Sequence, residues 1–210
     1  MKLIIILVGL PARGKSFISN KLNKYLNWCN IKTKIFNVGE LRRQKYEFEN
    51  SYFFDSSNTE LNKIRLNISL ELYDKLLEWI MLDNNDIAIF DATNSDKNKR
   101  KLLYERTPKD IKILYIESIC NDEKIIDKNI KLKKYSNDYK NNDIDYYKDF
   151  KSRINLYNNI YETIEKEEKI DFIKILNINI DEIPHIDMPL HTLIELTPNT
   201  YNFSKKYINF

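Results

Sequence analysis

The chain has 210 residues, and 34 basic against 31 acidic side chains give it a formal net charge of +3. This near balance argues against a protein that binds duplex nucleic acid. Two cysteines, Cys29 and Cys120, are too few for a disulfide framework or a zinc site. No membrane-length apolar stretch and no targeting signal is evident, so we expect a cytoplasmic protein without membrane contacts, whose ligands are small phosphates.

The first predicted element is an apolar strand, Leu3–Val8, followed directly by Gly9-Leu10-Pro11-Ala12-Arg13-Gly14-Lys15-Ser16, a complete phosphate-binding loop. Glycine lets successive N–H groups turn inward around a phosphate. Lys15 can reach the β- and γ-phosphates of a nucleotide, and the Ser16 hydroxyl can ligate Mg²⁺. A signal peptide is the weaker interpretation, because Arg13 and Lys15 interrupt the apolar run. An amphipathic helix is expected next, with Ile18, Leu22, Tyr25 and Leu26 on one face.

Later in the chain, short β-branched runs alternate with helix-patterned segments, which is typical of a parallel sheet with crossover helices. We expect five strands, at Leu3–Val8, Lys34–Asn37, Ile87–Asp91, Lys112–Glu117 and Phe172–Leu176. The predicted fold is therefore α/β, a three-layer α/β/α P-loop fold with a five-stranded, mainly parallel sheet.

Besides the helix after the phosphate loop, three more helices are expected between these strands. Ser57-Asn58-Thr59-Glu60 has the pattern of a capping box, and apolar residues continue at helical spacing from Leu61 to Ile80. The other two are expected at Asp122–Lys133 and Tyr147–Lys169. We interpret the polar stretch between them, Tyr135–Asp145, as a mobile lid.

The C-terminal part has a different character. From Asn177 onward the pattern is irregular, and Pro184, Pro189 and Pro198 exclude a long helix. We therefore expect a P-loop domain over residues 1–178 and an appendage over residues 179–210.

Asp91 ends the third predicted strand, at the edge of the sheet where open α/β folds bind their ligands. Beside a phosphate loop, this carboxylate can hold Mg²⁺ through water or accept the proton of an attacking hydroxyl, and both roles stay open. By itself it could also cap the next helix. Several cations near strand ends suit an anionic acceptor: Arg42, Arg43, Arg65, Lys99, Arg100, Lys134 and Arg153.

Five motifs follow one another along the chain. They are residues 9–16, Tyr25-Leu26-Asn27-Trp28, Phe36-Asn37-Val38-Gly39-Glu40 with Arg42-Arg43, Asp91-Ala92-Thr93-Asn94, and Glu117-Ser118-Ile119-Cys120. In this order they resemble the kinase domain of the 6-phosphofructo-2-kinase/fructose-2,6-bisphosphatase family. The resemblance implies a kinase that uses MgATP to phosphorylate fructose 6-phosphate at its 2-hydroxyl group, giving fructose 2,6-bisphosphate.

The resemblance also implies roles for individual residues. Nucleotide binding falls on Gly9–Phe17, Asn129 and Lys134, and Lys134 corresponds to a residue that touches both substrates. Fructose 6-phosphate binding falls on Arg42, Arg65, Thr93, Lys99, Arg153 and Tyr157. Asp91 and Cys120 correspond to active-site residues, although phosphoryl transfer needs no thiol, so we expect Cys120 only to line the site. An alternative is that Cys120 is simply a small buried residue at a strand end.

Two departures from the family matter. Lys99 stands where the family has an arginine, which keeps the charge but loses the forked donor unless Arg100 replaces it. The chain also has only two histidines, His185 and His191, and no glycine after Gly39. The histidine loop of the family's phosphatase is therefore missing, and we expect no bisphosphatase activity.

The tail itself resembles the extreme C-terminal segment of that phosphatase domain, through Met188–Thr192, Glu195–Pro198 and Tyr201. We interpret the middle of the phosphatase domain as deleted. The tail is then either a segment that docks on the ATP site or a remnant without function.

Rival functions stay open at this point. One is a P-loop kinase for another small metabolite, and another is a weakly active regulatory subunit that binds ATP and sugar phosphate. The expected ligands are ATP and fructose 6-phosphate, and a homodimer or a separate phosphatase chain are the protein partners considered.

Overall fold

A computed structural model describes residues 2–46, 50–135, 138–139 and 145–177, and the backbone alone of residues 192–198 and 203–209. Its centre is a five-stranded sheet in the order β2-β3-β1-β4-β5, with every pair of neighbours parallel. The strands are β1 (Leu3–Val8), β2 (Thr33–Asn37), β3 (Ile87–Asp91), β4 (Lys112–Ile119) and β5 (Phe172–Leu176). All five predicted strands are confirmed, and this sheet is parallel throughout.

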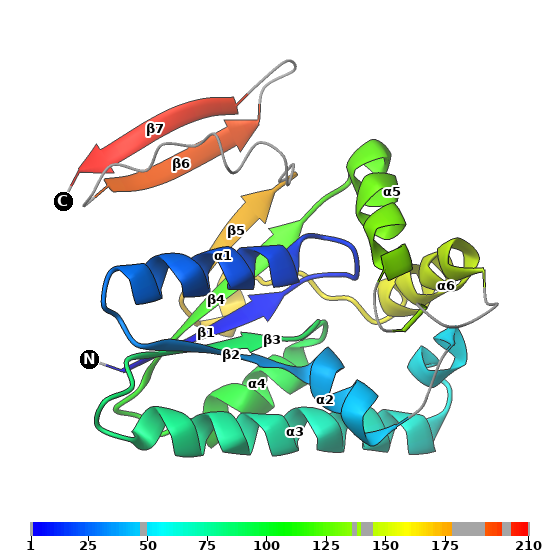
Figure 1. Ribbon diagram of the computed structural model, residues 1–210, viewed down its shortest axis with the longest axis horizontal. Helices are drawn as coiled ribbons and strands as arrows, with labels where there is room; N and C mark the ends of the chain where they lie inside the picture. The colour runs from blue at the N-terminus through cyan, green and yellow to red at the C-terminus, as the bar shows by residue number, and fades with distance from the viewer. Residues whose placement is uncertain are drawn as a thin grey trace.

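Helices cover both faces of the sheet and complete the predicted three layers (Figure 1). α1 (Lys15–Trp28) lies on one face, whereas α3 (Thr59–Met81) and α4 (Lys97–Arg106) lie on the other. Because side chains alternate along a strand, β1 serves both layers. Ile5 packs in the cluster that includes α1, and Ile4 packs in the cluster that includes α3.

The remaining helical elements gather at the carboxyl edge of the sheet (Figure 1). They are α2 (Val38–Lys45), α5 (Glu123–Leu132), α6 (Tyr146–Asn158) and the 3₁₀ turns η1 (Ser51–Phe54) and η2 (Lys133–Tyr135); a third such turn, η3 (Lys166–Glu168), precedes β5. α2 begins directly after β2, and α5 follows β4, so the chain places both beside the strand ends. The sequence predicted α5 but not α2 or α4, whose strongly polar composition hides the helical period.

The N-terminus of α3 differs from the predicted capping box. Asn58 is the capping residue, and its side chain accepts from the N–H groups of Glu60 and Leu61. Ser57 instead donates through its backbone and its hydroxyl to the carboxylate of Asp55. Because the Ser57 side chain is bound in that turn, Asn58 caps the helix instead.

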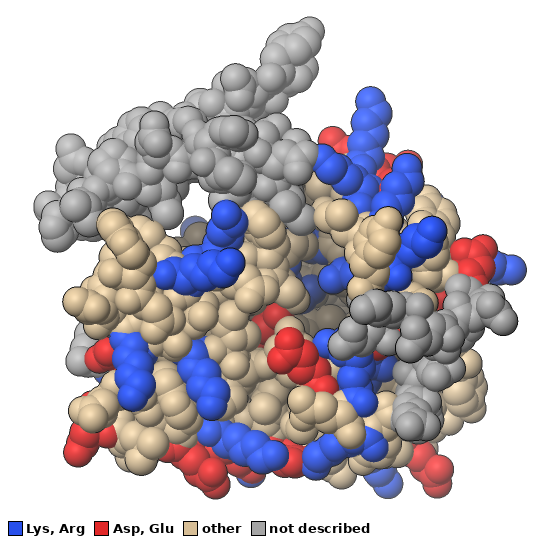
Figure 2. Space-filling model, viewed as in Figure 1, with Lys and Arg blue, Asp and Glu red and all other residues tan. Residues whose placement is uncertain are grey.

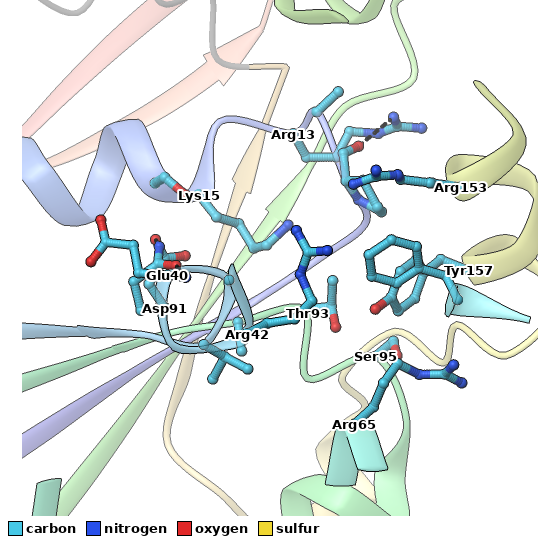
Figure 3. A pocket seen from close by; sticks show the side chains of 18 of the residues that line it. Arg13, Lys15, Glu40, Arg42, Arg65, Asp91, Thr93, Ser95, Arg153 and Tyr157 are labelled. Atoms are coloured by element: carbon cyan, nitrogen blue, oxygen red, sulfur yellow. Dashed lines mark hydrogen bonds between the residues drawn. The ribbon is translucent and has the colours of Figure 1, made fainter. Parts of the chain in front are cut away.

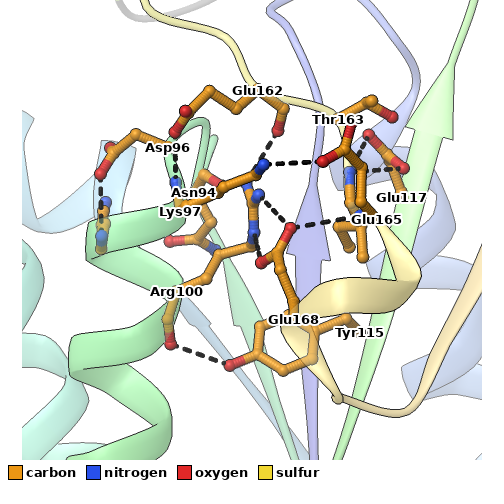
Figure 4. A network of polar contacts seen from close by, with 12 residues as sticks. Asn94, Asp96, Lys97, Arg100, Tyr115, Glu117, Glu162, Thr163, Glu165 and Glu168 are labelled. Atoms are coloured by element: carbon orange, nitrogen blue, oxygen red, sulfur yellow. Dashed lines mark hydrogen bonds and ion pairs between the residues drawn. The ribbon is translucent and has the colours of Figure 1, made fainter.

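The predicted long helix ending at Lys169 is wrong, because α6 ends at Asn158. The chain beyond it is bound to other elements through its backbone (Figure 4). The N–H of Glu162 donates to the Ser95 carbonyl at 2.8 Å, and Arg100 Nη1 donates to the Glu162 carbonyl at 2.9 Å. These tertiary bonds use the groups that a continuing helix would have paired internally.

In the C-terminal part, β6 (Thr192–Pro198) and β7 (Phe203–Asn209) form an antiparallel pair where the sequence predicted irregular structure. The division between residues 178 and 179 stays a prediction. Most of the expected lid and Tyr201 lie outside the described residues. No helix in the described parts of the chain is long and apolar enough to span a membrane.

Candidate active site

The phosphate loop connects β1 to α1 through an unusual backbone path. Gly9 has a φ of +138°, and a Cβ atom there would lie 2.4 Å from the Ser118 carbonyl oxygen. Gly14 has a φ of +80° immediately before α1 begins, and Ala12 also has a positive φ of 60°. Only glycine meets the demands at Gly9, where both the conformation and the close approach of β4 exclude a side chain.

Lys15 is the central cation of the loop. Its Nζ donates to the Leu10 carbonyl at 2.6 Å, and the side chain is buried. Burial lowers the pKa of Lys15 to about 7, although the nearby Asp91 carboxylate favours the charged form. An ammonium in this position gains much from an added anion, which is the requirement for binding a nucleotide phosphate.

Asp91 is held at the end of β3 by two polar neighbours. Its Oδ2 accepts from Asn37 Nδ2 at 2.6 Å and from the Ser19 hydroxyl at 3.3 Å. Parallel pairing places Asn37 of β2 opposite Asp91 in register. The sheet therefore fixes the carboxylate beside Lys15 before any ligand binds.

A cavity of about 830 Å³ opens beside the phosphate loop and extends to the helices at the carboxyl edge. Lys and Arg side chains gather around a hollow between α1, α2 and α6 (Figure 2). Sixteen of the predicted site residues line it: Pro11, Ala12, Arg13, Gly14, Lys15, Ser16, Phe17, Arg42, Arg43, Arg65, Asp91, Thr93, Lys99, Asn129, Arg153 and Tyr157. Side chains predicted to bind donor and acceptor thus share one space.

Arginines from three helices lie over aromatic rings in the cavity wall. The guanidinium carbons of Arg42 on α2 and Arg153 on α6 lie 5.4 and 4.7 Å from the Phe54 ring centre, and that of Arg65 on α3 lies 5.8 Å from the Phe53 ring centre. Lys15, Arg42 and Arg153 point toward one another from separate elements (Figure 3). Burial lowers the pKa of Arg42 and Arg65, as expected for cations with little access to water.

Lys99 and Arg100 are adjacent in the sequence, but only Lys99 lines the cavity. In the cavity wall, burial lowers the pKa of Lys99 to about 8. Arg100 lies outside it, with 1% of the residue exposed, and pairs through Nε and Nη2 with the Glu168 carboxylate at 2.8 and 2.7 Å (Figure 4). The suggestion that Arg100 replaces the family's arginine is therefore wrong, because Arg100 is committed to a structural ion pair.

Lys134 and Lys133 are adjacent in the sequence and differ in their relation to the cavity. Lys134 is exposed and is not among the described residues that line the cavity, whereas Lys133 does line it. Burial lowers the pKa of Lys133, with Asp91 acting in the opposite sense. Both residues belong to η2, where successive side chains point about 120° apart, so only one of the two can face the cavity.

Three other predicted residues do not line the cavity. Cys120 is buried at the end of β4, and its Sγ lies 3.8 Å from the Asp122 carbonyl oxygen. This agrees with the small buried residue considered as the alternative. Gly9 contributes conformation, donating its N–H to the Thr93 carbonyl at 3.0 Å, and Leu10 contributes the carbonyl that binds Lys15.

The structure adds cavity residues that the sequence did not predict, among them Asn37, Phe54, Lys133 and Asp138. Asn37 carried a usable signal, because it is a polar residue at the carboxyl end of a strand. Phe54 ends the short 3₁₀ turn η1 and Asp138 lies in a turn, and both contact residues of α6. No local pattern could have identified them.

Ser16 and Asp91 supply the oxygen donors expected for Mg²⁺. The hydroxyl and the carboxylate line the same cavity beside the loop. Mg²⁺ usually takes one or two protein ligands and completes its shell with phosphates and water. This donor set fits the ion.

The sheet order, the phosphate loop and the cavity define a P-loop kinase fold. The chain can be superposed on APS kinase CysC of Mycobacterium tuberculosis with a TM-score of 0.55 at 12% identity, covering 88% of this chain and 94% of that one. For Kti12 of Chaetomium thermophilum the TM-score is 0.57 at 17% identity, with coverages of 87% and 97%. At these identities the likeness shows the fold.

Sequence comparison narrows the class to one family. The family model described as 6-phosphofructo-2-kinase matches residues 1–186. A Schizosaccharomyces pombe protein described as "Probable 6-phosphofructo-2-kinase" is 42% identical over 194 residues, which covers 88% of this chain and 33% of the relative. 6-phosphofructo-2-kinase 1 of Saccharomyces cerevisiae is 39% identical over 186 residues, covering 84% and 22%. The chain belongs to the 6-phosphofructo-2-kinase family, and it spans a third or less of the length of these relatives.

Proposed function

We propose that the chain transfers the γ-phosphoryl group of MgATP to the 2-hydroxyl group of fructose 6-phosphate. The observation that carries this proposal is that one cavity is lined both by the phosphate loop and by the side chains of Arg42, Arg65 and Arg153. A donor phosphate and an acceptor phosphate can then be held at once, with the reacting groups between them. Membership of the 6-phosphofructo-2-kinase family supports the identity of the acceptor.

At the donor end, backbone N–H groups of the loop and the N-terminus of α1 surround the nucleotide phosphates. Lys15 leaves the Leu10 carbonyl to bind the β- and γ-phosphates, and Lys133 adds a second cation in the cavity wall. Ser16 and Asp91 would hold Mg²⁺, which neutralises charge on the phosphates when it is bound. These groups stabilise charge and position the donor, and no covalent enzyme intermediate is needed.

At the acceptor end, the arginines bind the 6-phosphate and Lys99 supplies a further positive charge. Asp91 is the carboxylate at the junction of the two ends and either accepts the proton of the 2-hydroxyl group or acts through the metal. Asn37 and Ser19 keep it oriented for either role. Thr93 and Tyr157 line the intervening wall.

The decisive experiment incubates the purified chain with MgATP and fructose 6-phosphate and assays acid-labile fructose 2,6-bisphosphate. Its absence at high protein concentration would refute the proposal. Asp91→Ala should lower kcat by about two to four orders of magnitude. As a matched control, Asp83→Ala changes an exposed aspartate in the loop before β3 and should leave kcat unchanged.

A panel of other phosphorylated sugars and hydroxylated metabolites, tested with labelled ATP, addresses the rival substrates. We expect fructose 6-phosphate to give the highest kcat/KM. The same preparation should not hydrolyse fructose 2,6-bisphosphate. Size measurement alone and with a phosphatase chain tests the homodimer and the separate-partner alternatives, and fractionation tests the expected cytoplasmic location.

A further inference from the structure

Arg153 is held along two of its edges by carboxylates. Its Nε donates to Asp149 Oδ2 at 2.9 Å, and its Nη1 donates to Asp138 Oδ2 at 3.1 Å. The remaining nitrogen, Nη2, is buried and has no hydrogen-bond partner in the described parts of the chain. The side chain lines the cavity and points inward from α6 (Figure 3). Because a buried donor without a partner is costly, Nη2 is prepared for an acceptor group that enters with a ligand.

Asp149 binds other groups in addition to Arg153. It is buried and also accepts from the Tyr139 hydroxyl at 2.6 Å and from the backbone N–H of Ser51. Ser51 begins η1, which carries Phe54, the ring under the Arg153 guanidinium. Asp149 does not itself line the cavity, so it acts on a ligand only through the groups that it holds, Arg153 and η1.

Asp138 joins the two arginines at the acceptor end. Its Oδ1 accepts from Arg42 Nη2 at 2.6 Å, while its Oδ2 binds Arg153. Arg43 Nη1 lies 3.8 Å from the same carboxylate. Burial opposes ionisation of Asp138, but Arg42 and Arg153 outweigh it and hold the pKa of this group below its usual value. One carboxylate thus keeps two buried guanidiniums at fixed positions.

We infer that Asp138 and Asp149 are positioning residues for the acceptor, which hold Arg153 so that its Nη2 donates to the phosphate group of the bound sugar phosphate. The inference rests on the proposed function. Charge alone predicts the opposite effect, since two carboxylates near a phosphate weaken its binding. If the carboxylates act by orienting Arg153, removing either of them weakens phosphate binding, because Nη2 of the released guanidinium is no longer aligned with the phosphate.

The sign of the change in affinity therefore tests the inference. Asp149→Asn and Asp138→Asn retain side-chain size while removing charge. For each we expect the Kd of fructose 6-phosphate, measured by calorimetry on the full chain without nucleotide, to rise about tenfold. The KM for MgATP and the kcat at saturating acceptor should stay within about threefold. Asp127→Asn is the matched control, because Asp127 pairs with Lys151 at the exposed face of α6.

A double-mutant cycle separates positioning from a general loss of structure. Lysine at position 153 has no fork to orient, so adding Asp149→Asn to Arg153→Lys should leave Kd unchanged. Additive effects would overturn the inference, as would tighter binding by either single variant. If Asp149→Asn does not unfold cooperatively in urea, the Asp138→Asn variant and its cycle with Arg153→Lys decide the matter.

The outcome for the wild-type chain separates this inference from the proposed function. If the wild type neither phosphorylates nor binds fructose 6-phosphate, the proposed function fails. Inorganic phosphate then becomes the probe for the same variants, with the same expected weakening. A wild-type chain that binds no phosphate at this site overturns the inference as well.

Discussion

The two ends of the cavity are constructed in different ways. The donor end comes from one continuous stretch, residues 9–17, whose backbone conformation and following helix provide most of the binding groups. The acceptor end is assembled from α2, η1, α3 and α6, and its groups are side chains held by one another. A local backbone motif tolerates change in its surroundings, whereas an assembled cluster depends on every element that contributes to it.

The largest effect should follow from breaking the donor end. Lys15→Met removes the phosphate-binding ammonium and should lower kcat by about a thousandfold. The free energy of unfolding should not fall. Burying the Lys15 ammonium is unfavourable, as its lowered pKa shows, and methionine removes this unfavourable burial. Steady-state kinetics and thermal unfolding measure the two quantities. Lys24→Met, on the exposed side of α1, is the control; a matching loss there would show that the helix, not the ammonium, is responsible.

The next largest effect is expected on stability, from a change at Arg100, which is buried beside the acceptor end. Arg100→Met breaks the buried pair with Glu168 and removes the donor to the Glu162 carbonyl. We expect a loss of about 3 kcal/mol in the free energy of unfolding, measured with urea. Arg106→Met breaks an exposed pair with Asp74 and should cost about 0.5 kcal/mol. Equal losses would contradict the assignment of Arg100 to the core of the fold.

A smaller and more selective effect is expected from a conservative change at the acceptor end. Arg42→Lys retains the charge but loses the planar fork, so the KM for fructose 6-phosphate should rise about tenfold. The KM for MgATP should be unchanged within about twofold, because the loop does not depend on Arg42. Arg106→Lys is the matched surface control. A parallel rise in both KM values would show that the two ends are not independent.

The smallest effect is a pH dependence that distinguishes Lys99 from an arginine. Its pKa of about 8 means that the free protein loses this charge as the pH rises from 7 to 9. A bound phosphate favours the protonated form, so affinity is greatest below pH 8 and falls above it, by at most about tenfold per pH unit. The KM for fructose 6-phosphate at saturating MgATP should therefore rise in the wild type.

Lys99→Arg should make this profile flat between pH 7 and 9, because the guanidinium remains charged. Lys101→Arg, two residues further along α4 and exposed, should keep the wild-type profile. Identical profiles for the wild type and Lys99→Arg would exclude Lys99 as the titrating group.

Much of the fold was predictable because its signals are local. The strands are apolar runs of the right length, and α3 repeats its apolar residues at helical spacing over 23 residues. α2 and α4 escaped prediction because few of their side chains are buried. The end of α6 escaped it because the residues that stop the helix, Arg100 and Ser95, are distant in sequence.

The sequence by itself determined the phosphate loop, the parallel strands and the placement of Asp91 at a strand end, because each depends on consecutive residues and on the two-residue period of a strand. Only the tertiary structure decided between Lys99 and Arg100 on α4. Neighbouring residues on an α-helix differ in direction by about 100°, so the packing of the whole element selects which one meets the cavity. The carboxylates that hold Arg153 likewise became visible only when α6, η1 and Asp138 were brought together.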